Sequence, residues 1–290
     1  MTFETTRPVV VVTGASSGIG RATAGELVAR GGQVIGVGRD PGRCAAAAAE
    51  IVAAAADGGR FVMLRGDFAL MADVARVAGE IRERTGRLDV VVNNAGGVRD
   101  RQLITAEGLE ATFATNHLAP FLLTRELMPL LTATAADAPG TVRVIAVSSS
   151  AHRASRGLRW DDLQSLRNFH PSGAYCQAKL ANLLFTRELA VRAAGDGVVA
   201  LAMHPGAVAS NFASHGDEQM QAHMAAIDTV PPEEPARTLV WLATDPEPGR
   251  AGGRYFHRMA VEEPAPQACD PDAAARLWTE SEKLLAEVGY

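Results

Sequence analysis

The chain has 290 residues, with 28 lysines and arginines against 33 aspartates and glutamates, so its formal net charge is −5. Hydrophobic residues make up 47% of the chain and charged residues 21%, which excludes a disordered, collagen-like or coiled-coil protein. Because there is no basic excess, we expect no nucleic-acid partner. The three cysteines, Cys44, Cys176 and Cys269, lack the spacing of metal ligands and indicate reduced thiols in a cytoplasmic compartment.

The opening residues do not have the pattern of a targeting signal. The segment MTFETTRPVVVVTGASSG carries one arginine before a short apolar run that ends in glycine, unlike a secretory signal peptide. Elsewhere no apolar run approaches the roughly 20 residues that a bilayer-spanning helix needs. We therefore expect a cytoplasmic protein without a membrane anchor.

Strand-like and helix-like patterns alternate along the chain. In chain order they predict a strand at residues 8–13, a helix at 18–31, a strand at 33–38, a helix at 41–56, a strand at 60–64, a helix at 70–85, a strand at 88–92, a helix at 107–136, a strand at 141–147, a helix at 174–194, a strand at 198–203 and a final helix after Pro271. The predicted strands are mostly continuous apolar runs, as expected where both faces of a sheet are buried. This alternation predicts an α/β fold, a doubly wound parallel sheet or Rossmann fold with helices on both faces.

Nothing in the sequence divides the chain into separate domains. The proline-rich stretches at residues 231–235 and 262–266 are interpreted as loops, and no internal repeat is present. We therefore predict a single domain over residues 1–290.

A glycine-rich segment follows the first predicted strand. It reads TGASSGIG from Thr13 to Gly20, so its glycines have the spacing G-x-x-x-G-x-G. Glycines allow a sharp turn and a close approach of the backbone to a ligand, and the next helix offers unpaired N–H groups to a pyrophosphate. An ordinary strand-to-helix turn is the alternative. The candidate cofactor contacts in this segment are Gly14, Ser16, Ser17, Gly18, Ile19 and Gly20.

Two charged residues after the second predicted strand bear on the choice of cofactor. A carboxylate here would bind the adenosine ribose hydroxyls of NAD, whereas an arginine would pair with the 2′-phosphate of NADP. Asp40 directly precedes Pro41, where it can instead cap the next helix. We therefore favour Arg39 as a phosphate ligand and NADP(H) as the cofactor, with NAD(H) as the alternative.

The order of its motifs makes the sequence similar to the short-chain dehydrogenase/reductase superfamily over about residues 8–285. The glycine-rich turn matches the cofactor turn of that family, Asn93-Asn94-Ala95-Gly96 matches its second signature, and Tyr175-x-x-x-Lys179 matches its catalytic pair. The strings TNHL (115–118), VSSSAH (147–152), AYCQAKLAN (174–182) and HPG (204–206) most resemble the retinol-dehydrogenase-like group. Membrane-bound members of that group carry an N-terminal apolar anchor, and the absence of such a segment here favours a soluble, bacterial member.

The resemblance implies a hydride-transfer enzyme whose catalytic residues are Asn116, Ser149, Tyr175 and Lys179. Tyr175 and Lys179 share one face of the predicted helix, where a lysine cation would lower the pKa of the tyrosine and make it an acid or base near neutral pH. Ser149, or one of its serine neighbours, can hydrogen-bond the substrate oxygen. The resemblance also assigns Lys179 to the nicotinamide ribose, and Asn116 to a water that links Lys179 to solvent.

Further cofactor contacts follow from the same resemblance. Asp67 corresponds to an acidic contact to the adenine, Asn94, Ala95 and Gly96 lie on the adenosine side, and Pro205, Gly206, Val208 and Ser210 lie around the nicotinamide. The histidines His117, His152 and His204 are interpreted as structural. No cluster of His, Cys or acidic residues has metal-ligand spacing, so we predict no metal.

Two segments are candidates for the substrate site, since loops after strand ends set specificity on such folds. Residues 150–173 hold Arg153, Arg159 and Trp160, and residues 208–230 hold Phe212, Met220 and Met224. The methionines and the phenylalanine would form an adaptable apolar lid, with ordinary helix packing as the alternative. We expect a small-molecule substrate, a hydrophobic aldehyde or ketone or the corresponding alcohol.

Two other functions stay open on the sequence alone. One is a cofactor-binding sensor or partner module without turnover, and the other is a non-redox epimerase or dehydratase with a tightly held nucleotide. The complete set of catalytic residue types favours an active NADP(H)-dependent oxidoreductase. The helices at 107–136 and 174–194 would suit a homo-oligomer or packing within a monomer.

Overall fold

The computed structural model describes residue 3 and residues 7–56, 58–138, 140–210 and 216–290. Its first half contains β1 (Val9–Thr13), α1 (Gly18–Ala29), β2 (Gln33–Gly38), α2 (Pro41–Ala53), β3 (Arg60–Arg65), α3 (Met71–Arg84) and β4 (Val90–Asn93). Its second half contains α4 (Ala111–Phe113), α5 (Ala119–Asp137), β5 (Arg143–Val147), α6 (Pro171–Arg192), β6 (Val199–Met203), α7 (Glu218–Ala226), α8 (Glu233–Thr244), β7 (Arg254–His257), β8 (Ala260–Val261) and α9 (Pro271–Glu287). The six predicted strands and the predicted helices therefore all form.

In the described part of the chain the strands make one eight-stranded sheet in the order β3-β2-β1-β4-β5-β6-β7-β8. All neighbouring strands are parallel except β7 and β8, so the predicted doubly wound parallel sheet is confirmed. Strand β1 lies between β2 and β4, so the chain winds outward from it in both directions. Such a switch point opens a crevice at the carboxyl ends of the strands, and ligands bind there.

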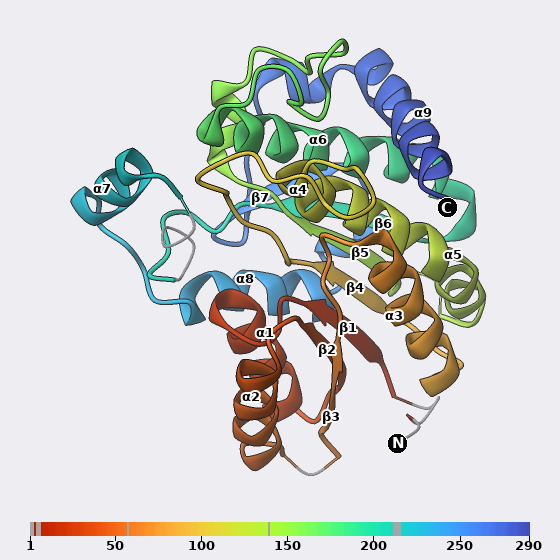
Figure 1. The fold of residues 1–290 in the computed structure, drawn as a ribbon. Helices are drawn as coiled ribbons and strands as arrows, with labels where there is room; N and C mark the ends of the chain where they lie inside the picture. Colours follow the sequence, from red (N-terminus) through yellow and green to blue (C-terminus); the bar gives the residue numbers. More distant parts are fainter. Residues whose placement is uncertain (1–2, 4–6, 57, 139, 211–215) are drawn as a thin grey trace.

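Helices cover both faces of the sheet (Figure 1). Along β1, Val9 and Val11 pack into one core with α3, α5, α6 and α9, while Val10 and Val12 pack into the other with α1 and α8. Successive strand side chains point to opposite faces, so four consecutive valines supply both cores at once. This explains why the strand is a continuous apolar run.

The structure differs from the long helix predicted at residues 107–136 in the first third of that range. The helix begins at Ala111, because the carboxylate of Glu110 accepts hydrogen bonds from the N–H groups of Thr112 and Phe113 and caps it. A π-helical turn at Ala114–Leu118 then precedes α5. Pro120 has no N–H to donate to the carbonyl of Asn116, four residues earlier, which accounts for the irregular turn at this place.

The second half also contains elements that the sequence pattern did not predict. Residues 231–235 were expected to be a loop, but α8 begins at Glu233 with Pro235 in its first turn, where the missing N–H has no cost. The β7–β8 hairpin turns through Arg258 and Met259, whose φ angles are 48° and 60°. Glycine or asparagine usually occupies such left-handed positions, so the turn carries no sequence signal.

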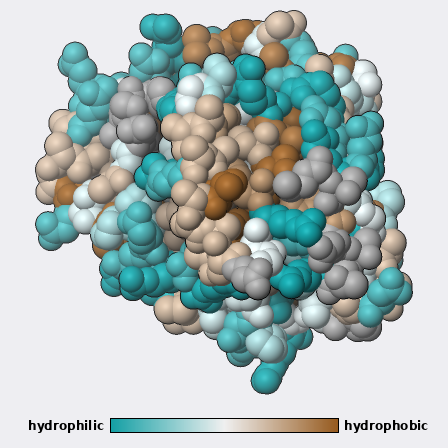
Figure 2. Space-filling view, turned by 90° about the horizontal axis from the view of Figure 1, so that it is seen from below, coloured by the Kyte–Doolittle hydropathy of each residue, from teal (hydrophilic) through white to brown (hydrophobic). Residues whose placement is uncertain are grey.

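One outer face of the molecule is shown in Figure 2, where hydrophilic residues surround patches of apolar ones. Among the described residues, none of the helices combines the length and the apolar character needed to cross a membrane.

Candidate functional site

A cavity of about 600 Å³ lies at the carboxyl ends of the parallel strands, at the switch point of the sheet. Its size lies within the range of small-molecule and cofactor sites. Most of the predicted site residues line it: Gly14, Ser16, Ser17, Gly18, Ile19, Arg39, Asp67, Asn94, Ala95, Gly96, Ser149, Tyr175, Lys179, Pro205, Gly206, Val208 and Ser210. Two predicted residues, Gly20 and Asn116, do not line it.

The glycine-rich turn is built so that the backbone itself forms the cavity wall. Gly14 has φ +72° and Gly18 has φ +52°, conformations that side chains with a Cβ rarely adopt. Ser17 is the N-cap residue of α1, but its side chain makes no capping hydrogen bond. The first N–H groups of α1 therefore remain available beside the cavity, in an arrangement suited to an anionic diphosphate.

Gly20 was expected to contact the cofactor, but it is not among the residues that line the cavity. Gly20 is buried, and a Cβ on it would lie 2.4 Å from the carbonyl oxygen of Gly14 and 2.6 Å from the Asn94 amide nitrogen. Its lack of a side chain lets α1 pack directly against the turn. Gly20 thus shapes the turn from behind and does not face the cavity.

Charged side chains gather where β2 and β3 end. Arg39 lies 3.8 Å from the carboxylate of Asp67, and both residues line the cavity. Asp40 caps α2 by accepting a hydrogen bond from the N–H of Arg43, as the alternative interpretation of this residue predicted. Its carboxylate is therefore already used by the helix, which leaves Arg39 as the polar group at the end of β2.

The Asn93–Gly96 signature ties β4 to β1. The Asn94 amide donates to the carbonyl of Thr13, and the Thr13 hydroxyl accepts from the N–H groups of Asn94 and Ala95. Asn93 is buried and donates to the hydroxyl of Thr124 on α5. The segment thus fixes the floor of the cavity between the two central strands.

The candidate catalytic side chains meet between β5 and α6. The Lys179 ammonium donates to the carbonyl of Val147 at 2.9 Å and lies 5.5 Å from the centre of the Tyr175 ring. The hydroxyl groups of Tyr175 and Ser149 are hydrogen-bonded. Ser148 instead uses its hydroxyl to hold the backbone of Lys179, which distinguishes it from Ser149.

The expected lowering of the tyrosine pKa does not hold for this cavity. Burial raises the pKa of Tyr175, and the hydrogen bond from Ser149 only partly opposes that effect. Burial also lowers the pKa of Lys179 to about 8. Tyr175 is therefore held as a protonated phenol beside a lysine that loses its charge in mildly alkaline solution.

Asn116 lies behind the cavity wall, in the π-helical turn. Its side-chain oxygen accepts from the N–H of Gly97, and its amide donates to the carbonyls of Gly97 and Thr112. A Cβ on Gly96 would lie 2.5 Å from the Asn116 side-chain oxygen and 3.3 Å from the Lys179 nitrogen. Asn116 thus supports the segment that separates it from the cavity, close to Lys179.

Apolar side chains also line the cavity, and the sequence analysis predicted only some of them. Met220 and Met224 of α7 line it, while Phe212 lies outside the described residues. Residues that were not predicted as site residues also line the cavity: Phe68, Val98, Arg99, Thr115, Ala151, Cys176 and Ile227. Only their position after a strand end, or next to Tyr175, could have suggested them.

Most of the residue 150–173 segment, which was a candidate for the substrate site, does not line the cavity. Only Ser150 and Ala151 of this segment are among the described cavity residues. Arg159 donates to Gln177 and Asn168, and the Trp160 ring packs under the guanidinium of Arg276 on α9. The apolar part of the lining is therefore built mainly by α7 and by the chain after β4.

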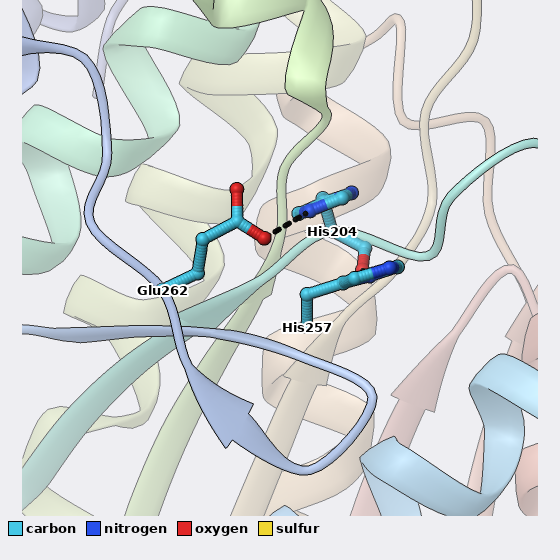
Figure 3. A group of neighbouring side chains, drawn as sticks. All are labelled: His204, His257 and Glu262. Atoms are coloured by element: carbon cyan, nitrogen blue, oxygen red, sulfur yellow. Dashed lines mark hydrogen bonds and ion pairs between the residues drawn. The ribbon is translucent and has the colours of Figure 1, made fainter.

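One group of ligand-type side chains lies near the cavity: His204, His257 and Glu262 (Figure 3). The two imidazole rings are stacked, with centroids 4.0 Å apart and an angle of 7° between their planes. A ring nitrogen binds a metal in its own ring plane, and two parallel planes cannot meet at one ion. As arranged, these residues form a hydrogen-bonded stack, and the absence of a metal stays a prediction.

The cavity is lined by glycines and lies at the switch point of a doubly wound sheet, with a tyrosine and a lysine on one face of α6. This combination defines the class of nucleotide-dependent oxidoreductases. The family model described as short chain dehydrogenase matches residues 8–221, and the chain belongs to this family. Retinol dehydrogenase 13 from Homo sapiens is 38% identical over 285 residues, which cover 95% of this chain and 84% of that protein. The predicted retinol-dehydrogenase-like subgroup is therefore confirmed.

Solved structures agree with this assignment. The crystal structure of an uncharacterised protein from Mycobacterium paratuberculosis has a TM-score of 0.73 and 32% identity, covering 96% of this chain and 93% of that one. The NADP complex of Pseudomonas aeruginosa RhlG has a TM-score of 0.68 and 28% identity, covering 86% and 93%. The protein is thus a short-chain dehydrogenase/reductase, an enzyme that acts on CH–OH groups or carbonyls with a nicotinamide cofactor.

Proposed function

We propose that this enzyme is an NADP(H)-dependent reductase of hydrophobic aldehydes or ketones, which also oxidises the corresponding alcohols. The observation that carries the proposal is a single cavity lined by arginine side chains, by the Ser149–Tyr175–Lys179 cluster and by the methionines of α7. Relatives named as retinol dehydrogenases support a long apolar substrate.

The lining of the cavity supports the binding of a dinucleotide. The positive-φ glycines at positions 14 and 18 leave the backbone open to a diphosphate, and the N–H groups at the start of α1 are not capped by Ser17. Arg39 and Asp67 would hold the adenosine end. Gly14, Ser16, Ser17, Gly18 and Ile19 would hold the diphosphate, Asn94, Ala95 and Gly96 the adenosine side, and Lys179, Pro205, Gly206, Val208 and Ser210 the nicotinamide end.

The chemistry follows from the middle cluster. When bound, the nicotinamide supplies the hydride that reaches the carbonyl carbon. The Ser149 hydroxyl would hydrogen-bond the carbonyl oxygen, and Tyr175 would give that oxygen its phenolic proton. Because its pKa is raised, Tyr175 stays protonated and so holds the proton that carbonyl reduction consumes, although the same shift makes it a weaker acid. The charged Lys179 would then stabilise the phenolate that forms.

Arg39 is expected to decide the preference between the two nicotinamide cofactors. Arg39→Gln should raise the dissociation constant for NADPH by about 10–100-fold and leave that for NADH unchanged, because a charge-assisted hydrogen bond to the 2′-phosphate is lost. Cofactor fluorescence titration measures both constants. Arg30→Gln, which removes an exposed arginine paired with Glu26, is the matched control. A wild-type protein that binds NADH more tightly than NADPH would show that Arg39 was misinterpreted.

Met220 and Met224 are expected to bind the apolar tail of the substrate. The double variant Met220→Ser/Met224→Ser should raise KM about tenfold for long-chain aldehydes and hardly at all for short ones, because each lost buried methylene weakens binding. The assay follows the loss of reduced-nicotinamide absorbance with aldehydes of increasing length and with retinal. Met259→Ser, on the exposed hairpin, serves as the control. Equal effects on short and long aldehydes would contradict a substrate role for α7.

A further inference from the structure

Ser149 and Gly206, which line the cavity on two sides, are connected by hydrogen-bonded histidines to the segment that follows the β7–β8 hairpin. This segment, residues 262–265, is called the C-terminal strap. It lies close to the 3-10 helix Ser150–Ala154 on one side and to the end of β6 on the other. Its contacts with both involve the buried side chains of His152 and His204 and the exposed side chain of Arg153.

His152 connects the strap to Ser149. The side chain of His152 is completely buried, and its Nε2 lies 3.0 Å from the backbone nitrogen of Ala265. A backbone N–H can only donate, so Nε2 must accept and the proton must reside on Nδ1. Nδ1 lies 2.7 Å from the carbonyl oxygen of Ser149, to which it therefore donates. One neutral imidazole thus bridges Ser149 and the strap.

His204 makes the equivalent connection on the other wall. The N–H of Gly206 donates to Nδ1 of His204 at 3.3 Å, so the proton lies on Nε2 and is donated to Glu262 at 3.0 Å (Figure 3). The other carboxylate oxygen of Glu262 accepts from Arg153 at 2.7 Å. The buried ring of Tyr255 packs between His152 and His204, with centroids 5.4 Å from each.

These contacts form a continuous chain from Ser149 through His152, the strap and His204 to Gly206. Ser149 and Gly206 both line the cavity, but His152 and Glu262 do not. We infer that His152 is a positioning residue, which fixes the backbone of Ser149 against the C-terminal strap and thereby aims the Ser149 hydroxyl at the substrate oxygen. This inference rests on the proposed role of Ser149 in carbonyl reduction.

The physical reason is the short reach of the serine side chain. Its hydroxyl can move only by one side-chain rotation, so its place in the cavity depends on the backbone at residue 149. That backbone leaves β5 in an extended conformation, with φ −157° and ψ 151°, and starts the 3-10 helix whose Ala151 N–H the Ser149 oxygen caps. The imidazole therefore acts on a segment that has just left the rigid sheet, where small displacements weaken catalysis strongly.

Two substitutions of His152 separate its two hydrogen bonds. In His152→Asn the amide can replace Nδ1 and still donate to the Ser149 carbonyl. In His152→Gln the amide reaches the place of Nε2 and can bind only the strap. Because each variant keeps only one of the two hydrogen bonds, neither ties Ser149 to the strap, and we expect kcat to fall about tenfold in both. The dissociation constant for NADPH should not change in either variant.

Combination with Ser149→Ala shows whether His152 acts through Ser149. If it does, Ser149→Ala/His152→Gln should be no slower than Ser149→Ala alone, because the group that His152 aims is already absent. His170→Gln, an exposed histidine at the start of α6, is the matched control and should behave as wild type. Circular dichroism and the unfolding temperature establish that each variant is folded.

The outcomes are distinct. A kcat close to that of the wild type in His152→Asn, or a loss in the double variant equal to the product of the single losses, would show that the bridge does not act through Ser149 and overturn the inference. The same holds if Ser149→Ala is inactive while His152→Gln keeps the wild-type kcat, although the proposed reaction then stands. If Ser149→Ala itself is as active as wild type, the proposed reaction chemistry fails, and the inference fails with it.

Discussion

Tyr175→Phe is expected to lower kcat by about 10²–10⁴-fold while the dissociation constant for NADPH stays the same. The phenylalanine ring keeps the shape of the cavity wall but removes the only proton that this side chain could give to the substrate oxygen. Steady-state reduction of an alkyl aldehyde and fluorescence titration of NADPH measure the two quantities separately. Tyr290→Phe, near the C-terminus and packed against the larger core, is the control.

Either of two results would count against Tyr175 as the acid. A Tyr175→Phe variant with near-normal kcat would mean that another group donates the proton. A wild-type protein that binds NADPH but reduces no carbonyl would move the function to a cofactor-binding module. Cofactor that survives purification and is used without net redox change would instead indicate an epimerase or dehydratase.

Lys179→Met is expected to abolish turnover and yet to stabilise the cofactor-free protein near neutral pH. The lysine is 4% exposed, and burial lowers its pKa from 10.5 to about 8. Below pH 8 the folded protein must keep this buried cation, at a cost of up to about 3 kcal/mol. Methionine removes the charge, although the Val147 carbonyl then loses its donor, so we expect a net gain of roughly 1–3 kcal/mol.

The sign of the pH dependence follows from proton counting. Between pH 8 and 10.5 the unfolded chain binds more protons at this lysine than the folded one, so the free energy of unfolding of the wild type rises with pH relative to Lys179→Met. The stability difference should therefore shrink across that window. Urea unfolding of both proteins at several pH values measures it. A methionine variant that is less stable than wild type below pH 8 would show that the lysine is stabilising despite its burial.

The sequence specified the central half of this fold because its signals are local. Four consecutive valines can only be a strand buried on both faces, and a glycine turn before a helix identifies the cofactor end without any knowledge of long-range contacts. The same holds for Tyr175 and Lys179, which lie on one face of one helix. These features needed only the periodicity of the chain and the chemistry of single side chains.

The remaining features depend on partners distant in sequence or on backbone conformations that carry no residue signal. The β7–β8 turn uses Arg258 and Met259 in left-handed conformations, so no glycine or asparagine marks it. The effect of burial on the pKa of Tyr175 exceeds that of its neighbours, and burial cannot be read from helix spacing. His152 and Ala265 are 113 residues apart, so their contact exists only once the sheet has formed.

The position of the C-terminal strap also sets the order in which the site can be completed during synthesis. A domain generally folds as a unit, and its N-terminal residues leave the ribosome first. The glycine turn and the strands β1 to β4 lie within the first 93 residues, whereas the strap begins at residue 262. Ser149 and His204 therefore acquire their anchors only after almost the whole chain has been made, so the site for chemistry cannot be complete before the C-terminal elements emerge.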